Sequence, residues 1–317
     1  MEPDPSFFTA TDDLEIAYYK WLPKTEYPHA IVQIAHGMAE HAARYDHFSG
    51  FMAGQGFAVY ASDHRGHGVT ADRNGTHGDF GPEPGWQSVV NDMKTLTDIA
   101  RKEFPDIPVF LLGHSMGSFL TRTYISQFGS ALQGVILSGT AGNPGFTGRL
   151  GRWMAKRAMH RYGAEFASPT LDNMSFGSYN KHIPYPRTRF DWLTRDEAIV
   201  DKYITDPWCG FVCSNRFFYE LLGGLCAIFR KANIRCIPAD LPLFFIAGSE
   251  DPVGKFGKGV RQSVDIYKKN GIRKLTLKFY PGARHEILNE LNAAEVYADI
   301  HKWIQTILSP LPAAMEV

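Results

Sequence analysis

The pentapeptide Gly113-His114-Ser115-Met116-Gly117 matches G-x-S-x-G, a pattern that surrounds nucleophilic serines. In this pattern the serine occupies a sharp turn between a strand and a helix, and the small flanking residues let the two elements approach each other. The apolar run IPVFLL precedes the motif, and SFLTRTYISQF follows it with helical spacing. This context favours a nucleophile over a serine that only caps a helix, so we predict that Ser115 is a nucleophile.

A serine hydroxyl needs a base to accept its proton, and the base needs a carboxylate to orient it. When the serine lies on such a turn, the chain order is serine, acid and then histidine, so the base must follow Ser115. His160 and His182 follow it within a loop-rich region, and His301 lies in an amphipathic stretch. His285 instead comes directly after the apolar run LTLKFYPGA, at the end of an expected strand. We therefore predict that His285 is the base.

The orienting acid must lie between Ser115 and His285 and must also follow a strand. Asp251 meets both conditions, because it comes shortly after the run LFFIA. Pro252 restricts the backbone beside it. Glu250 is the alternative. The predicted catalytic triad is Ser115, His285 and Asp251.

A tetrahedral intermediate needs backbone N–H donors that face its oxyanion. We expect one from Met116, directly after the nucleophile, and one from Met38, where Gly37 permits an unusual turn in AIVQIAHGMAEH. His36 and His41 in the same segment can also be interpreted as zinc ligands or as a second base. We favour a structural role for both, because no further metal ligand stands at a suitable spacing.

Short apolar runs alternate with amphipathic stretches along most of the chain, and this alternation predicts an α/β fold with a mostly parallel sheet covered on both faces. The chain begins with an expected antiparallel edge hairpin within its first 22 residues. The expected strands cover residues 30–37, 57–66, 108–115, 134–140, 241–249 and 275–283, and the clearest helices cover 87–103, 115–128 and 293–308.

The alternation stops between about residues 142 and 239, where the sequence is rich in arginine, aromatic residues and loops. This stretch holds 14 Lys and Arg residues against 8 Asp and Glu residues. An insertion of distinct composition between two core strands is typical of a cap over the sheet's carboxyl edge. We therefore predict a core formed by residues 1–142 and 239–317, with a cap formed by residues 143–238.

The segment 148–163 of the predicted cap has the pattern of a basic amphipathic helix. One side of it collects Leu150, Trp153, Met154, Ala158 and Met159, and the remainder carries Arg149, Arg152, Lys156, Arg157 and Arg161. Such a helix either docks on anionic lipid or packs its apolar side on the core, and we favour packing. A second apolar group either lines an acyl tunnel or packs in the core; it comprises Phe211, Phe217, Phe218, Tyr219, Leu221, Leu222 and Leu225.

The composition of the chain limits the binding partners and the cellular location that we expect for the protein. Lys and Arg together number 33, equal to Asp and Glu, which argues against a general nucleic-acid binder. The N-terminus lacks a signal-peptide pattern, and no apolar run approaches the ~18 residues that span a bilayer. Four cysteines fall between residues 209 and 236, and we expect free thiols and no zinc site. We expect a cytoplasmic protein, with peripheral membrane contact through the cap left open and the oligomeric state undetermined.

Several motifs resemble the monoacylglycerol lipase and lysophospholipase branch of the α/β-hydrolase superfamily, which groups with serine aminopeptidase-type hydrolases. Residues 36–45 resemble H-G-x-x-E-H-x-x-R-Y, and residues 63–68 resemble the start of D-x-R-G-H-G-x-S, with Val69-Thr70 where G-x-S is usual. Residues 113–118 resemble the family's serine turn with Ser118 in place of a final glycine, and residues 249–253 and 283–290 resemble its acid and histidine loops. The resemblance covers roughly residues 10–142 and 239–308.

This resemblance implies an α/β-hydrolase fold and an ester hydrolase with no cofactor, often acting on monoacyl lipids at a membrane surface. Combined with the triad, it predicts a serine hydrolase that cleaves monoacylglycerol or lysophospholipid esters through an acyl-enzyme. Esters with short acyl chains, non-lipid esters, thioesters and peptides at a free N-terminus are the alternative substrates, because the same triad serves all of them. A non-catalytic binding module on the same fold is disfavoured, because every member of the triad is present.

Overall fold

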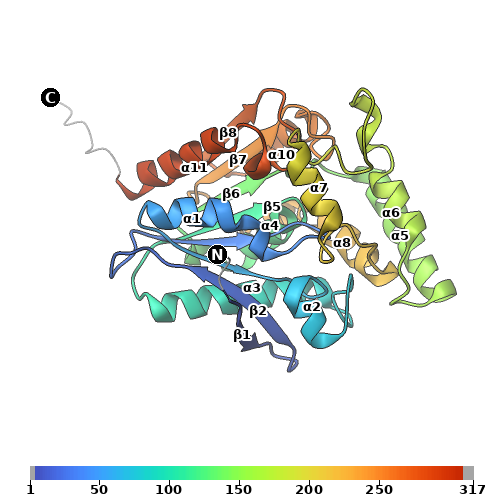
Figure 1. Ribbon diagram of the computed structural model, residues 1–317, viewed down its shortest axis with the longest axis horizontal. Helices are drawn as coiled ribbons and strands as arrows, with labels where there is room; N and C mark the ends of the chain where they lie inside the picture. The colour runs from blue at the N-terminus through green and yellow to red at the C-terminus, as the bar shows by residue number, and fades with distance from the viewer. Residues whose placement is uncertain (1–3, 310–317) are drawn as a thin grey trace.

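A computed structural model describes residues 4–309 of the chain. Its centre is an eight-stranded sheet in the order β1-β2-β4-β3-β5-β6-β7-β8 (Figure 1). The strands are β1 (Ser6–Thr9), β2 (Glu15–Trp21), β3 (Ile31–Ala35), β4 (Ala58–Ser62), β5 (Val109–His114), β6 (Gly134–Ser138), β7 (Leu243–Gly248) and β8 (Leu275–Tyr280). Strands β3 to β8 pair in parallel, while β1 and β2 form an antiparallel hairpin at one edge. The α/β prediction and the edge hairpin are confirmed.

The central strands are buried on both faces, as their unbroken apolar runs predict. Every residue of β3, β4, β5, β6 and β7 is buried. A parallel sheet needs helices on both faces, so its strands carry apolar residues without alternation. Ala35 pairs with Gly113, and His114 pairs with Ser138, so the carboxyl ends of β3, β5 and β6 meet at one edge of the sheet.

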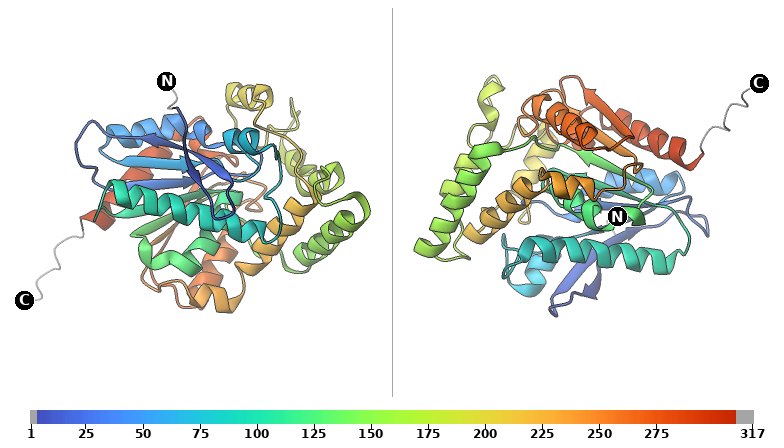
Figure 2. Two further views of the ribbon diagram at one scale, coloured as in Figure 1. Left: turned by 90° about the horizontal axis from the view of Figure 1, so that it is seen from below. Right: turned by 180° about the vertical axis from the view of Figure 1, so that it is seen from behind.

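Helices cover the two faces and build two apolar cores (Figures 1 and 2). One core contains side chains of α1 and α11, and the other contains side chains of α3, α4 and α10. The helices of these layers are α1 (Asp46–Gly54), α3 (Gly85–Glu103), α4 (Met116–Phe128), α10 (Lys258–Lys269) and α11 (Ala293–Leu308), and α2 (Gly68–Asn74) lies beside β2. The three helices expected from periodicity are among them.

The chain between β6 and β7 adds helices but no strand to the sheet, and α5 and α8 pack side by side next to it (Figure 1). These helices are α5 (Gly145–Tyr162), α6 (Pro169–Phe176), α7 (Glu197–Thr205), α8 (Asn215–Ala227) and α9 (Lys231–Arg235). Short 3₁₀ segments cover Ala42–Tyr45, Gly129–Ala131, Tyr179–His182 and Ile287–Asn289. Within residues 4–309, none of the helices combines the length and the apolar character needed to cross a bilayer.

Candidate active site

Ser115 lies on the turn that joins β5 to α4, as its motif predicts. Its backbone has φ 52° and ψ −120°, a region that residues with a Cβ atom rarely occupy. Its side chain makes no capping hydrogen bond to α4, so a helix cap does not explain the residue. Strained backbone of this kind concentrates at functional sites, where the surrounding structure over-determines it.

The two glycines of the motif allow this tight turn. A Cβ atom added to Gly117 would lie 2.0 Å from the carbonyl oxygen of Ala35, and one added to Gly113 would lie 2.4 Å from Oγ1 of Thr121. Both distances are far below van der Waals contact, so neither position can carry a side chain. The start of α4 thereby packs directly against the end of β3, which brings Ser115 close to the loop that follows β3.

His285 and Asp251 form a buried pair at the ends of the last two strands. The Nδ1 atom of His285 lies 3.0 Å from Oδ1 of Asp251, and both side chains are almost completely buried. The same oxygen accepts the backbone N–H of Val253 at 2.9 Å. Glu250, the alternative acid, is exposed, and its carboxylate accepts from Oγ of Ser249 at 3.3 Å. The structure thus brings Asp251, and not its neighbour, to the imidazole.

The surroundings of His285 favour its protonated form. Burial by itself would lower the pKa of the imidazole, but the charge and the hydrogen bond of Asp251 raise the pKa above its ordinary value. The charges of Glu286 and Glu40 act in the same direction. A neutral His285 can accept a proton, and a nearby carboxylate then stabilises the imidazolium.

Two backbone N–H groups beside Ser115 are available to an oxyanion. Within the described part of the chain, the N–H groups of Met38 and Met116 have no hydrogen-bond acceptor. The N–H of Gly37 is occupied, because it donates to Oε1 of Glu40 at 2.5 Å. The N–H groups of Met38 and Met116, the two residues expected from the sequence, are therefore free to donate within the described structure.

The residue after Met38 has a second unusual backbone conformation. Ala39 has φ 52°, and its carbonyl oxygen accepts from Oη of Tyr203 at 2.9 Å and from the N–H of Gly210 at 3.0 Å. Both donors come from the segment between β6 and β7, so this segment holds the loop that presents the Met38 N–H. The sequence carries no signal for these contacts.

A buried charge network, which the sequence analysis did not assign, ties the loop after β3 to the loop of His285. Arg44 donates from Nη1 to Glu40 at 2.6 Å, and from Nη1 and Nη2 to Glu286 at 2.8 and 2.7 Å. Burial by itself would raise the pKa of Glu286, but Arg44 lowers it to about 2. Burial raises the pKa of Glu40 despite Arg44. The i, i+4 spacing of Glu40 and Arg44 was a visible signal, whereas the pairing with Glu286 was not.

The histidines of the loop after β3 make structural contacts. Nε2 of His36 accepts the backbone N–H of His64 at 2.9 Å, which places its proton on Nδ1, 2.7 Å from the Gly37 carbonyl oxygen. Burial lowers the pKa of His36 well below its ordinary value, so the ring is neutral. His36 thus links the loops at the ends of β3 and β4.

His41 has two further potential metal ligands beside it, contrary to the expectation from sequence spacing. Donor atoms of His41, Asp206 and Cys209 all lie within 4.8 Å of one another. Nε2 of His41 pairs with Oδ2 of Asp206 at 2.8 Å, and burial raises the pKa of the Cys209 thiol, so the sulfur is protonated. A thiol must lose its proton to bind a metal ion, so the group fits a hydrogen-bonded link better than a metal site.

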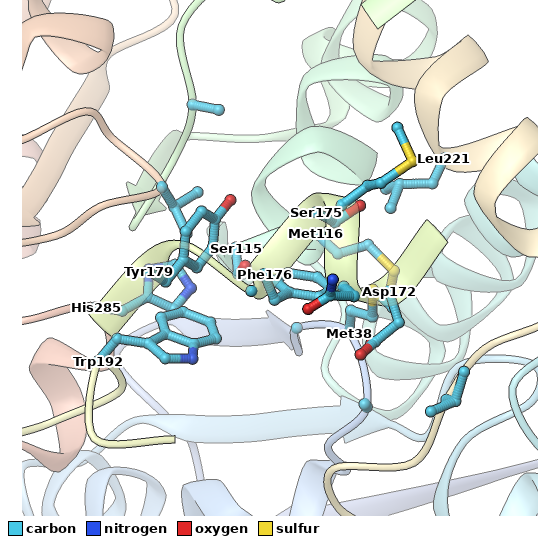
Figure 3. A pocket seen from close by; sticks show the side chains of 18 of the residues that line it. Met38, Ser115, Met116, Asp172, Ser175, Phe176, Tyr179, Trp192, Leu221 and His285 are labelled. Atoms are coloured by element: carbon cyan, nitrogen blue, oxygen red, sulfur yellow. The ribbon is translucent and has the colours of Figure 1, made fainter. Parts of the chain in front are cut away.

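One large cavity contains Ser115, His285, Met38 and Met116 in its lining, with a volume of about 940 Å³. Figure 3 shows Ser115 between His285 on one side and the two methionines on the other. The ring of Trp192 lies 5.1 Å from that of His285. The other histidines that follow Ser115 lie outside this lining.

The two apolar groups expected in the cap divide between several roles. Leu150 and Met154 of α5 line the cavity, together with Phe211, Leu221, Leu222 and Leu225 of the second group. Phe217 and Phe218 are instead buried in the core of the helices that cover the sheet. Trp153 is 56% exposed, so the predicted apolar side of α5 does not pack as a whole.

An eight-stranded, mostly parallel sheet with a serine on the strand-to-helix turn after β5 defines the class of α/β-hydrolases. A sequence profile described as "Serine aminopeptidase, S33" matches residues 26–292. The chain belongs to this family.

Individual relatives are similar over nearly the whole chain. A monoacylglycerol lipase of Mycolicibacterium smegmatis is 29% identical over 302 residues, covering 94% of this chain and 95% of its own. A monoglyceride lipase of Mus musculus is 28% identical over 290 residues, covering 90% of this chain and 84% of its own. The crystal structure of a carboxyl esterase from Bacillus coagulans in complex with glycerol has a TM-score of 0.90 and 31% identity, covering 98% of this chain and 100% of its own.

Proposed function

We propose that this chain hydrolyses carboxylic esters of monoacyl lipids through an acyl-enzyme on Ser115. The observation that carries the proposal is the strained backbone of Ser115 at the wall of a cavity of about 940 Å³. This volume lies toward the upper end of the ~300–1,000 Å³ typical of small-molecule sites. The lipase and esterase names of the relatives support the same substrate class.

In the proposed reaction, His285 accepts the hydroxyl proton as Ser115 attacks the ester carbonyl carbon. The Asp251 carboxylate, 3.0 Å from Nδ1, orients the imidazole and stabilises its charged form. The N–H groups of Met38 and Met116 hold the oxyanion. His285 then gives its proton to the leaving alcohol, and it next accepts a proton from the water that attacks the acyl-enzyme. The final proton transfer returns the free acid and the Ser115 hydroxyl.

Charges in the cavity wall favour an uncharged headgroup. Arg44 pairs with both Glu40 and Glu286, and Arg189 pairs with Asp172 at 2.6 Å. Every acidic residue in the described lining of the cavity thus has a cationic partner. Arg189, the arginine in that lining, is paired as well. A peptide ammonium would find no free carboxylate there, and a lysophospholipid phosphate would find no free cation. A neutral glycerol ester fits this arrangement best.

We further propose that residues 143–238 act as a cap on a core of residues 1–142 and 239–317. Residues of α5 and α8 support this division. They belong to the segment between β6 and β7, and they line the same cavity as Ser115, which lies in the core. Exposed Phe146, Leu150 and Trp153 on α5 support a role for the cap in peripheral contact with a lipid surface.

The test is an ester series of rising acyl length with wild-type protein and Ser115→Ala. We expect monoacylglycerols with long acyl chains to be hydrolysed with higher kcat/KM than lysophosphatidylcholine of the same chain, and Ser115→Ala to lose both activities. A sharp optimum at short chains would contradict the lipid substrate, and full activity of clean Ser115→Ala would contradict the nucleophile. Release of amino acids from peptides or of thiols from thioesters at higher kcat/KM would instead favour those substrates.

A further inference from the structure

A second cavity, of about 670 Å³, lies between α5 and α8 and is separate from the cavity of Ser115. Four cationic side chains line it, and its described lining contains no carboxylate. These four are Arg149, Arg152 and Lys156 of α5, together with Arg230 after α8. Aromatic side chains of Trp153, Tyr219 and Phe229 form other parts of the wall.

The four cations lack a carboxylate at ion-pair distance within the described residues. Among residues 4–309, no ion pair involves Arg149, Arg152, Lys156 or Arg230. Glu220, next to Tyr219 in α8, accepts from the backbone N–H of Trp86 at 3.1 Å. Burial raises the pKa of Glu220, and the charge of Arg152 acts in the opposite direction without forming an ion pair. Arg149, Lys156 and Arg230 are exposed, so solvent screens part of the repulsion between them, and a bound anion would reduce the rest.

The side chain of Arg152 is held by contacts with Tyr219, but one of its donor atoms, Nε, has no acceptor among the described residues. Its Nη2 donates to Oη of Tyr219 at 2.8 Å, and its guanidinium lies 4.3 Å from the centre of that ring. A Cβ atom on Gly223 would approach its Nε to 3.0 Å, so this glycine leaves the room that the guanidinium occupies. The Nε atom is buried and has no acceptor within the described residues. A buried donor without an acceptor is unfavourable.

Cys226 lies in the wall of the same cavity as the cations. Burial raises the pKa of this thiol, while the charges of Arg152, Arg149 and Arg230 act in the opposite direction. Several guanidinium groups that line one cavity suit a ligand group with several charged oxygens, because each guanidinium can donate more than one hydrogen bond.

We propose that the cavity between α5 and α8 binds a phosphate-bearing anion, with the phosphoryl oxygens on Arg149, Arg152, Lys156 and Arg230. The aromatic walls accommodate the organic part that carries the phosphate. This chemistry is shared by a free phosphorylated solute and by the headgroup of an anionic lipid. The binding site does not depend on the proposed ester hydrolysis.

The same two helices connect this anion site to the cavity of Ser115. Leu150 and Met154 of α5 and Leu221 and Leu225 of α8 line the cavity of Ser115, while neighbouring residues of both helices line the anion site. A bound phosphate would neutralise the repulsion between the cations and hold α5 against α8. It would thereby stabilise the wall that faces the acyl chain.

The test measures binding of inorganic phosphate by calorimetry at constant ionic strength set with chloride. The double variant R149Q/R230Q removes two cations from the anion site, whereas R157Q/R161Q removes the same charge from exposed positions of α5 outside the cavity. We expect saturable binding to wild type, at least about tenfold weaker binding to R149Q/R230Q, and less than about a twofold change in the control. Thermal unfolding of each variant checks that the fold is intact without reference to ester hydrolysis.

Vesicles distinguish the two sources of the phosphate. Binding to phosphatidylcholine vesicles that contain phosphatidic acid, lost in R149Q/R230Q and absent with phosphatidylcholine alone, would assign a lipid headgroup. Binding of free phosphate without such vesicle binding would assign a solute. Equal losses in the two double variants would overturn the site in favour of diffuse charge attraction, as would the absence of binding to both phosphate and phosphatidic acid.

Discussion

Ser115 holds a backbone conformation that costs roughly 1–3 kcal/mol, and the glycines on both sides make it possible. In this conformation the Ser115 side chain makes no capping hydrogen bond to α4 and instead lines the cavity. The pair of His285 and Asp251 adds a second local requirement, because a carboxylate must lie beside Nδ1 to orient the base.

Replacing Asp251 by Asn tests that requirement. The amide has nearly the same shape, but it no longer holds the imidazole in the tautomer that leaves Nε2 free to accept a proton. We expect kcat to fall by about 10⁴-fold, as for comparable serine hydrolase triads. Steady-state ester hydrolysis measures the loss, and circular dichroism confirms the fold. Glu250→Gln is the matched control, because Glu250 is the neighbouring acid and is exposed. We expect this variant to keep the activity of the wild type.

The pH profile tests the electrostatics of the base. Catalysis needs a neutral His285, and Asp251 raises the pKa of His285 above the ordinary value of 6.5. Activity must therefore fall as the pH decreases through that raised pKa, and we expect the acidic limb of kcat/KM to have its midpoint above 6.5. In Asp251→Asn the limb should move to lower pH. A limb at the same pH in both proteins would show that another group controls it.

At the scale of elements, loops from opposite halves of the chain build the site together. Arg44, just before α1, bonds both Glu40 and Glu286, so the loop that carries Met38 and the loop that carries His285 share one buried network. Ala39 adds contacts from the segment between β6 and β7. Loops that are joined by buried ion pairs keep their relative positions. Proton transfer by His285 and oxyanion binding by Met38 both require such fixed positions.

Glu286→Gln weakens this link between loops. Removing one charge from a buried pair should lower the free energy of unfolding by about 2–4 kcal/mol at pH 7. Because Arg44 lowers the pKa of Glu286 from 4.5 to about 2, the contribution is present above pH 4.5 and is lost as the pH falls toward 2. The stability difference between wild type and variant should shrink over that interval. Denaturant unfolding at several pH values measures it, and a constant difference would contradict the ionic origin.

At the scale of the whole molecule, the sheet and its two helical layers present the serine, while the segment between β6 and β7 forms the opposite wall of the cavity (Figures 1 and 3). The wall decides which substrates fit, because the apolar side chains of α5 and α8 that line the cavity replace water around an acyl chain.

Leu225→Trp tests this wall by filling part of the cavity. We expect kcat/KM for long-chain monoacylglycerols to fall by about tenfold or more, because added bulk in a packed apolar wall excludes part of the chain. Esters with short acyl chains should change by less than about twofold. Ile204→Trp on the exposed side of α7 is the control for added aromatic bulk, since Ile204 is 45% exposed. An equal loss for all chain lengths would place Leu225 outside the acyl path.

The sequence by itself predicted the α/β class and the positions of the strands along the chain, and it singled out five candidate site residues. These follow from local patterns: buried parallel strands need continuous apolar runs, and a strained serine turn needs glycine on both sides. Only the tertiary structure decided that Arg44 pairs with Glu286, that Trp153 stays exposed while Met154 lines the cavity, and that four cations line a second cavity whose described lining contains no carboxylate. Contacts between residues far apart in the chain depend on how whole helices and loops pack, and no local spacing encodes that packing.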